Sequence, residues 1–309
     1  MKVLKFGGTS VGSAQRMKDV AKLIVGEKNL IVLSAMSGTT NSLVEISDYL
    51  YKKNPDGANE IINKLSQKYF GHIDELYATE EYKEKARELV TFHFDHIRSF
   101  TKDLFTLFEE KVVLAQGELI STGMMNLYLQ EQGVNSVLLP ALDFMRTDKN
   151  AEPDPVYIKE KLNRLLEENA GADLYITQGY ICRNAYGEID NLQRGGSDYT
   201  ASLIGAAIKA EEIQIWTDID GMHNNDPRFV KGTSPVRHLH FEEAAELAYF
   251  GAKILHPTCI LPAKINNIPV RLLNTMQPDA PGTLISNATE KGKIKAVAAK
   301  DNITAIKIK

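Results

Sequence analysis

The sequence contains only two cysteines, Cys182 and Cys259. They lie far apart and outside any Cys-x-x-Cys pattern, which excludes a disulfide framework and argues against a thiolate metal site. Cysteine usage of this kind is typical of a reducing compartment, so we expect a cytoplasmic protein.

The sequence also lacks a long apolar run and an excess of positive charge. The N-terminus reaches Gly7 after a handful of residues, too early for a signal peptide or a membrane span. The formal net charge is −4. We therefore expect neither nucleic acid nor an anionic membrane as the main partner.

What is present is ordinary globular composition: 309 residues, 43% hydrophobic and 25% charged, enough for one large domain or two lobes. Short apolar runs without alternation predict strands buried on both faces, at Val3–Phe6, Leu30–Leu33, Val112–Ala115, Ser136–Leu139, Leu174–Thr177 and Ile213–Thr217. Helical patterns separate most of them, at Ala14–Val25, Gly117–Gln132, Pro155–Asn169 and Asp198–Ala210. This alternation predicts an α/β fold with helices covering a mostly parallel sheet.

Residues 43–110 interrupt the alternation, because their apolar residues recur at helical spacing. We interpret this stretch as a helical insertion. Within it, His93 and His96 would form a metal site only if both rings faced inward and a third ligand joined them, so ordinary packing is the favoured interpretation.

Glycines follow a predicted strand in Lys5-Phe6-Gly7-Gly8-Thr9-Ser10, just before a helix. Glycine lets backbone N–H groups close around an oxyanion, and the helix N-terminus adds a favourable dipole. The motif is no Walker A loop, because the Gly-Lys-Ser/Thr order is absent. A simple glycine turn with a solvated Lys5 explains it almost as well.

A second glycine pair stands in Arg194-Gly195-Gly196-Ser197-Asp198, again before a helix. Ser197 or Asp198 as the helix N-cap is the structural alternative, but it leaves the arginine and both glycines unexplained. An arginine beside such a turn suits bidentate binding of a carboxylate or phosphate, which we favour.

Two further motifs carry polar residues. Trp216-Thr217-Asp218 ends a predicted buried strand, where open α/β sheets bind ligands, and it leads through His223 to Arg228. Part of this loop can equally be a turn rich in Asn and Asp, and it lacks the glycine and glutamate positions of an EF-hand. The segment Phe250–Pro257 places Lys253 after a helix, where it either stabilises the helix end or binds phosphate.

Taken together, these motifs resemble the aspartate kinase branch of the amino-acid kinase superfamily from Met1 to about Ile285. Six segments occur in the family's order: Lys5–Val11, Ser34–Asn41, Gly117–Glu118, Arg194–Thr200, Trp216–Asp218 and Phe250–Pro257. The resemblance implies a reaction that phosphorylates the side-chain carboxylate of aspartate with ATP, the first step in making lysine, threonine and methionine.

The resemblance also implies an organisation. The catalytic domain would cover residues 1–290, with an aspartate lobe to about 190, insertion included, and a nucleotide lobe over 191–290. Residues 291–309 resemble a linker and the first strand of an ACT regulatory domain, so we expect a truncated chain. The family leads us to expect a homodimer.

By similarity, each site residue receives a role. Substrate binding falls to Ser34, Thr40, Glu118, Arg194, Gly195, Gly196 and Ser197. Nucleotide binding falls to Lys5, Phe6, Gly7, Gly8, Thr217, Asp218, His223, Arg228, Lys253 and Ile254. The catalytic residues are Lys5, Lys253 and Asp198, the last as an organiser of the two lysines, and Mg²⁺ would be held mainly through the phosphates of ATP.

Two residues depart from the family pattern. Gln193 stands where relatives often have glycine, and His223 stands where many have tyrosine. The first concerns the geometry of the substrate loop and the second the contact with adenine. The alternatives to an aspartate kinase are a kinase acting on glutamate or acetylglutamate, and a non-catalytic nucleotide-binding protein of this fold.

Overall fold

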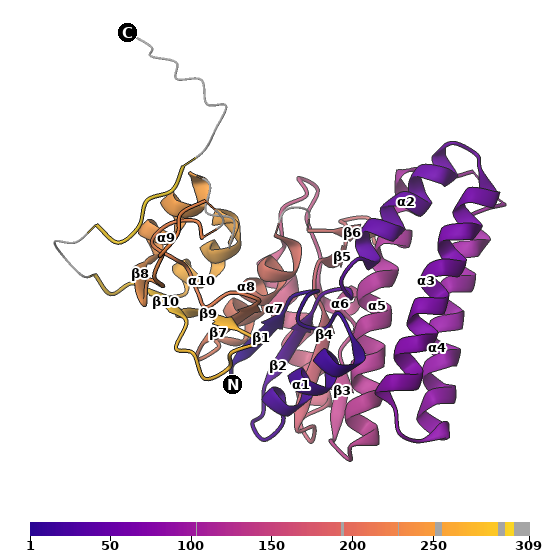
Figure 1. Ribbon diagram of the computed structural model, residues 1–309, viewed down its shortest axis with the longest axis horizontal. Coiled ribbons are helices and arrows are strands. Elements are labelled where there is room, and N and C mark those ends of the chain that lie inside the picture. Colours follow the sequence, from indigo (N-terminus) through magenta and orange to yellow (C-terminus); the bar gives the residue numbers. More distant parts are fainter. Residues whose placement is uncertain (103, 193–194, 228, 251–254, 290–293, 300–309) are drawn as a thin grey trace, which may run out of the picture.

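The computed structural model describes residues 1–102, 104–192, 195–227, 229–250, 255–289 and 294–299. An eight-stranded sheet runs through it in the order β3-β4-β2-β1-β7-β9-β10-β8 (Figure 1). Its strands are β1 (Val3–Phe6), β2 (Leu30–Leu33), β3 (Ser136–Leu138), β4 (Leu174–Gln178), β7 (Ile213–Thr217), β8 (His238–His240), β9 (Val270–Asn274) and β10 (Thr283–Ser286). Neighbours are parallel except β9 and β10. The predicted α/β class is confirmed.

The helices cover both faces of this sheet. They are α1 (Ala14–Ile24), α2 (Thr39–Tyr51), α3 (Pro55–Leu76), α4 (Glu80–Ser99), α5 (Leu107–Glu131), α6 (Ala141–Phe144), α7 (Pro155–Glu168), α8 (Gly196–Ile208), α9 (Phe241–Tyr249) and α10 (Leu261–Ile265), with a 3₁₀ turn η1 (Pro257–Ile260). Central strands are buried along their whole length, which explains their unbroken apolar sequence.

Side chains of β1 alternate between two hydrophobic clusters. Leu4 and Phe6 join the cluster formed with α1 to α5, whereas Val3 packs on the other face with α7 and α8. Because strand side chains alternate, Lys5 faces the same side as Val3, toward α8. The central strand therefore presents one lysine to the helix that carries Asp198.

Helices α2, α3 and α4 stand beside α5, away from the sheet, and confirm the predicted helical character of residues 43–110 (Figure 1). The predicted strand at Val112–Ala115 is wrong, since these residues lie inside α5. Thr106 is the N-cap of this helix, and its capping box with Glu109 satisfies the first turn. A short apolar run cannot separate a buried strand from a helix that is buried on most sides.

A second, two-stranded antiparallel sheet pairs β5 (Ile181–Arg183) with β6 (Ile189–Asn191). Near the C-terminus, residues 294–299 form no regular secondary structure. The strand predicted within residues 291–309 is therefore not seen over 294–299, and residues 300–309 lie outside the described chain. No helix of the described residues is long and apolar enough to cross a membrane.

Candidate active site

The carboxyl ends of β1, β2 and β4 bring three loops together. The amide of Ser34 donates to Phe6 O at 3.2 Å, and that of Gly179 donates to Leu33 O at 2.9 Å. On the other side of β1, Gly7 N–H donates to Trp216 O at 3.3 Å. Ligands of open α/β sheets bind at this edge, and most predicted site residues gather there.

Lys5 and Asp198 form an ion pair at this edge. The Lys5 Nζ lies 2.7 Å from Asp198 Oδ1, and both side chains are largely shielded from solvent. A Cβ placed on Gly7 would lie 3.5 Å from the same Nζ, so the ammonium also faces the glycine turn. The predicted association of Lys5 with Asp198 is confirmed. Its second predicted partner, Lys253, lies outside the described residues.

Gly8 lets the loop after β1 touch the loop after β2. A Cβ at Gly8 would stand 2.7 Å from Ala35 O, a distance that no side chain tolerates, and Gly8 O accepts a 3.1 Å hydrogen bond from Ser37 N–H. Phe6, predicted at the nucleotide, is fully buried and stacks on Trp216 with centroids 5.6 Å apart. Its side chain supports the floor of the site and is not available to a ligand.

Glu118 is buried, with 4% of its surface exposed. Its Oε1 accepts a 3.2 Å hydrogen bond from Ala35 N–H, while its buried Oε2 has no partner among the described residues. Gly117 permits this approach, because a Cβ there would be 2.8 Å from Ala35 Cβ. Burial raises the pKa of Glu118 to about 7, although the Ala35 N–H and the Lys5 charge oppose the rise.

Ser34 and Ser197 connect the predicted substrate loops, since their Oγ atoms lie 2.9 Å apart. Gly195 adopts a left-handed conformation with φ of 70° and forms the N-cap of α8. Gly196 packs so closely on Tyr180 that a Cβ would meet its ring carbon at 2.4 Å. Thr40 is exposed in the first turn of α2, and Arg194 lies outside the described residues.

Three of the other predicted nucleotide residues, Thr217, Asp218 and His223, lie on the other side of β1. Thr217 ends β7, and its Oγ1 accepts a 3.3 Å hydrogen bond from Ile219 N–H, which shapes the following turn. Asp218 is exposed there. His223 is farther along, with Nδ1 3.0 Å from Thr233 Oγ1. Arg228, Lys253 and Ile254 lie outside the described residues.

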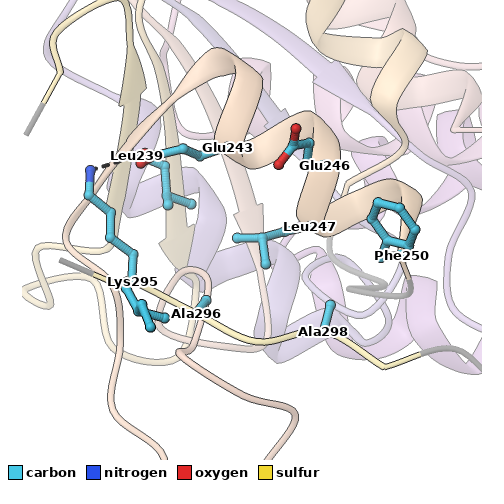
Figure 2. A pocket seen from close by; sticks show the side chains of 9 residues that line it. Leu239, Glu243, Glu246, Leu247, Phe250, Lys295, Ala296 and Ala298 are labelled. Atoms are coloured by element: carbon cyan, nitrogen blue, oxygen red, sulfur yellow. Dashed lines mark hydrogen bonds and ion pairs between the residues drawn. The ribbon is translucent and has the colours of Figure 1, made fainter. Parts of the chain in front are cut away.

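A late segment of the chain, residues 294–298, also reaches this side. It runs along α9, and together they line an open pocket of about 280 Å³ (Figure 2). Lys295 Nζ lies 3.0 Å from Glu243 on α9, and Val297 N–H donates to Asn224 O at 2.9 Å. This stretch was predicted as part of a linker and the first strand of a regulatory domain, and no contact with the nucleotide side was expected of it.

The sequence analysis also missed Ala35, Gly179 and Tyr180. Ala35 contributes only its backbone N–H, which no side-chain pattern reveals. Gly179 allows Ser197 to approach, since a Cβ would lie 2.4 Å from its Oγ. Gly179, which follows the predicted strand at 174–177 after the single residue Gln178, was the available signal.

In the described part of the chain, no group of three or more His, Cys, Asp or Glu residues is placed to hold an ion. His93 is buried in the helical insertion with Nδ1 2.7 Å from Gln116 Oε1, and its desolvation lowers its pKa. Packing and this hydrogen bond account for His93.

Residues 1–274 match the family model described as the amino acid kinase family. The chain belongs to this family. Within it, the chain is similar to aspartokinases: it is 35% identical to aspartokinase 3, chloroplastic, of Arabidopsis thaliana over 99% of this chain and 57% of the relative. It is 34% identical to lysine-sensitive aspartokinase 3 of Escherichia coli (strain K12), over 98% of this chain and 68% of that protein.

The fold is also similar to solved structures of aspartokinases. The crystal structure of E. coli aspartokinase III in complex with aspartate and ADP superimposes with a TM-score of 0.85 at 33% identity, covering 94% of this chain and 65% of that one. Aspartate kinase from Clostridium acetobutylicum gives 0.74 at 26% identity, covering 94% and 64%. The chain thus spans a little over half the length of the Arabidopsis relative and about two thirds of the E. coli one.

Proposed function

We propose that this chain transfers the γ-phosphoryl group of ATP to the side-chain carboxylate of aspartate, giving 4-phospho-L-aspartate. The observation that carries the proposal is the buried, unpartnered oxygen of Glu118 beside the Lys5–Asp198 pair. The carboxylate of Glu118 suits the ammonium group of an amino acid, and the nearby Lys5, shielded from solvent, suits a phosphate group. The E. coli relative solved with aspartate and ADP supports the same pair of ligands.

The chemistry needs charge control more than a base. An aspartate side chain has a pKa of about 3.9 and is already ionised as the nucleophile at neutral pH. Its approach to a polyphosphate is opposed by repulsion, so a fixed cation that stabilises the transferring group lowers the barrier. Lys5 is that cation, and Asp198 orients it. Mg²⁺, bound mainly through the phosphates of ATP, would neutralise further charge.

Recognition of aspartate would use groups from several of the loops that meet at the carboxyl ends of β1, β2 and β4. Glu118 in its ionised form accepts the substrate ammonium, and Ser34 and Ser197 offer hydroxyls. Arg194 binds the α-carboxylate bidentately, as its guanidinium fork is suited to do. ATP lies across β1, against the loop that starts at Thr217, with Lys253 as a second phosphate cation.

Glu118 also bears on the rival substrates. An acetylated amino group carries no positive charge, so acetylglutamate would leave the buried carboxylate of Glu118 unpaired at a cost of about 1–3 kcal/mol or more. A free amino acid is therefore favoured. Glutamate differs from aspartate by one methylene, which moves its carboxylate away from the position that Lys5 serves. The two free, buried cysteines suit the reducing cytoplasm in which we place this reaction.

The test is an ADP-release assay of this chain with aspartate, glutamate, acetylglutamate and no amino acid. We expect ADP release that depends on aspartate and an acid-labile acyl phosphate as product. Faster release with glutamate or acetylglutamate would assign another acceptor. ATP binding without any acceptor-dependent release would make the chain a nucleotide-binding protein and overturn the proposal.

A further inference from the structure

The β5–β6 hairpin leads directly into the loop proposed to bind aspartate. It is a two-stranded sheet separate from the main one, and such a ribbon is marginally stable alone. All three residues of β6 are only half-buried, so little apolar burial fixes this strand. Ile181 and Cys182 of β5 are buried in the core and place that strand, so a polar contact is needed mainly to fix β6.

An ion pair joins the hairpin to α5. Lys111 Nζ lies 2.7 Å from Asp190 Oδ1, with side chains 25% and 15% exposed. Lys111 precedes Glu118 by seven residues, or two helical turns, so both stand on one face of α5, about 10 Å apart along its axis. The hairpin is thus fastened to the helix that carries the proposed ammonium acceptor.

The other end of the hairpin contacts the substrate loop. Leu192 N–H donates to Tyr180 O at 2.8 Å, and Tyr180 N–H donates to Thr200 Oγ1 at 3.0 Å. Tyr180 also packs against Gly196 at the start of α8. A shift of β6 therefore moves both ends of the loop relative to Glu118.

We propose that Lys111 and Asp190 are positioning residues for the amino-acid substrate. Their ion pair holds β6 on α5 and thereby sets the position of Leu192, the last described residue before the proposed substrate loop, relative to the carboxylate of Glu118. The proposal rests on the proposed function. It predicts an effect on the affinity for the amino acid and none on the phosphoryl-transfer step or on ATP.

The experiment compares Lys111→Met, Asp190→Asn, Lys111→Arg and the charge swap Lys111→Asp with Asp190→Lys. Each of the first two should raise the KM for aspartate by about three- to tenfold, as loss of a partly buried ion pair implies. The kcat and the KM for ATP should stay within twofold. Lys111→Arg should remain near the wild type, and the swap should recover at least half of the loss on a logarithmic scale.

The matched control is Lys64→Met, which removes an exposed ion pair with Glu60 on α3 and should change no constant. An unchanged aspartate KM in Lys111→Met overturns the proposal. So does a common fall in kcat and in both affinities together with a lower Tm, which would indicate general loosening. A higher KM in Lys111→Met but a lower one in Asp190→Asn would mean that Lys111 binds the substrate directly.

Failure of the proposed function is recognised separately. In that case the wild type shows neither aspartate-dependent ADP release nor a rise in Tm on adding aspartate. Wild-type activity with unaffected variants rejects only the role of the ion pair.

Discussion

The two sides of the candidate site are built differently. On the side proposed to bind aspartate, Glu118 and the Ser34–Ser197 pair lie on elements packed so closely that glycine is required at Gly117 and Gly179. On the side proposed to bind the nucleotide, Thr217 and the exposed Asp218 begin a long loop before β8. A small amino acid needs each of its charged groups matched by a fixed side chain, whereas a nucleotide offers a large surface and several phosphates.

This difference has an energetic side. A buried carboxylate oxygen without a partner destabilises the folded chain unless the group is protonated. The ionised Glu118 therefore lowers the free energy of unfolding, and pairing with a bound ammonium removes this loss. Bound substrate should stabilise the protein. Four substitutions break or sharpen the comparison, from the largest expected effect to the smallest.

Lys5→Ala breaks the point where the two sides meet. We expect kcat to fall by about a hundredfold or more, since the lysine stabilises charge that moves between oxygens, while circular dichroism shows an intact fold. The control is Lys2→Ala, at the residue just before β1. It removes a more exposed ion pair, between Lys2 and Glu27, and should leave kcat unchanged. A folded Lys5→Ala protein with near-normal kcat would contradict the phosphoryl-clamp role.

Arg194→Lys tests the aspartate side alone. An ammonium cannot reproduce a planar two-bond grip, so the KM for aspartate should rise by about tenfold or more, with a small change for ATP. Arg164→Lys, on the exposed face of α7, should leave both constants unchanged. Equal rises in the two KM values would remove Arg194 from the substrate site.

Glu118→Gln separates two effects of the buried charge, its effect on stability and its effect on aspartate binding. The folded-state pKa of Glu118, about 7, exceeds the ordinary 4.5, so the folded chain holds this proton more tightly than the unfolded chain. Stability from this group is fully present below pH 4.5 and is lost as pH rises to 7, by on the order of 3 kcal/mol. Glutamine should remove this loss and raise Tm at pH 8 more than at pH 5.

The same variant should bind aspartate about tenfold more weakly at pH 8, because a neutral amide pairs poorly with an ammonium. Thermal melts from pH 5 to 8, with and without aspartate, measure both effects. The control is Glu110→Gln on the same helix, because the Glu110 carboxylate accepts a hydrogen bond from the Tyr51 hydroxyl and lies toward solvent. Gln116→Glu is unsuitable as a control, since Gln116 is hydrogen-bonded to the buried His93. A pH-independent difference between wild type and Glu118→Gln would refute the assigned ionisation.

Much of this could be predicted from the sequence, for physical reasons. Two central strands, Val3–Phe6 and Leu30–Leu33, are buried on both faces, so their unbroken apolar sequence predicts them. Gly7 and Gly8, directly after the first strand, indicate where the candidate site lies. Pairing of Lys5 with Asp198 followed from the family pattern. The strand assigned at Val112–Ala115 failed because α5 is buried on most of its sides, which erases the helical period.

Other features left no local signal. The ion pair between Lys111 and Asp190 joins residues 79 positions apart, and nothing near either one names its partner. Ala35 acts through its backbone, which any residue supplies. Contacts of these kinds depend on how α5, β6 and the loop after β2 meet, and they become visible only in three dimensions.

Lys295→Ala tests how far the nucleotide side depends on a segment late in the chain. The Lys295 side chain, 8% exposed, pairs with Glu243, whose carboxylate also accepts the His240 N–H at the start of α9. Two residues later, Val297 N–H donates a hydrogen bond to Asn224 O in the loop that follows Thr217. Removing the lysine frees this segment from α9 and should loosen that loop.

We expect the KM for ATP to rise by about two- to fourfold and that for aspartate to stay unchanged, because one partly buried ion pair is worth about 1 kcal/mol or less in such a place. Lys264→Ala is the matched control, since it removes an exposed ion pair between Lys264 and Glu242, the residue before Glu243 on α9. Initial rates with either substrate varied measure both constants. A change confined to aspartate would mean that the segment serves the other side of the site, and the contrast between a packed amino-acid side and a loop-built nucleotide side would then be wrong.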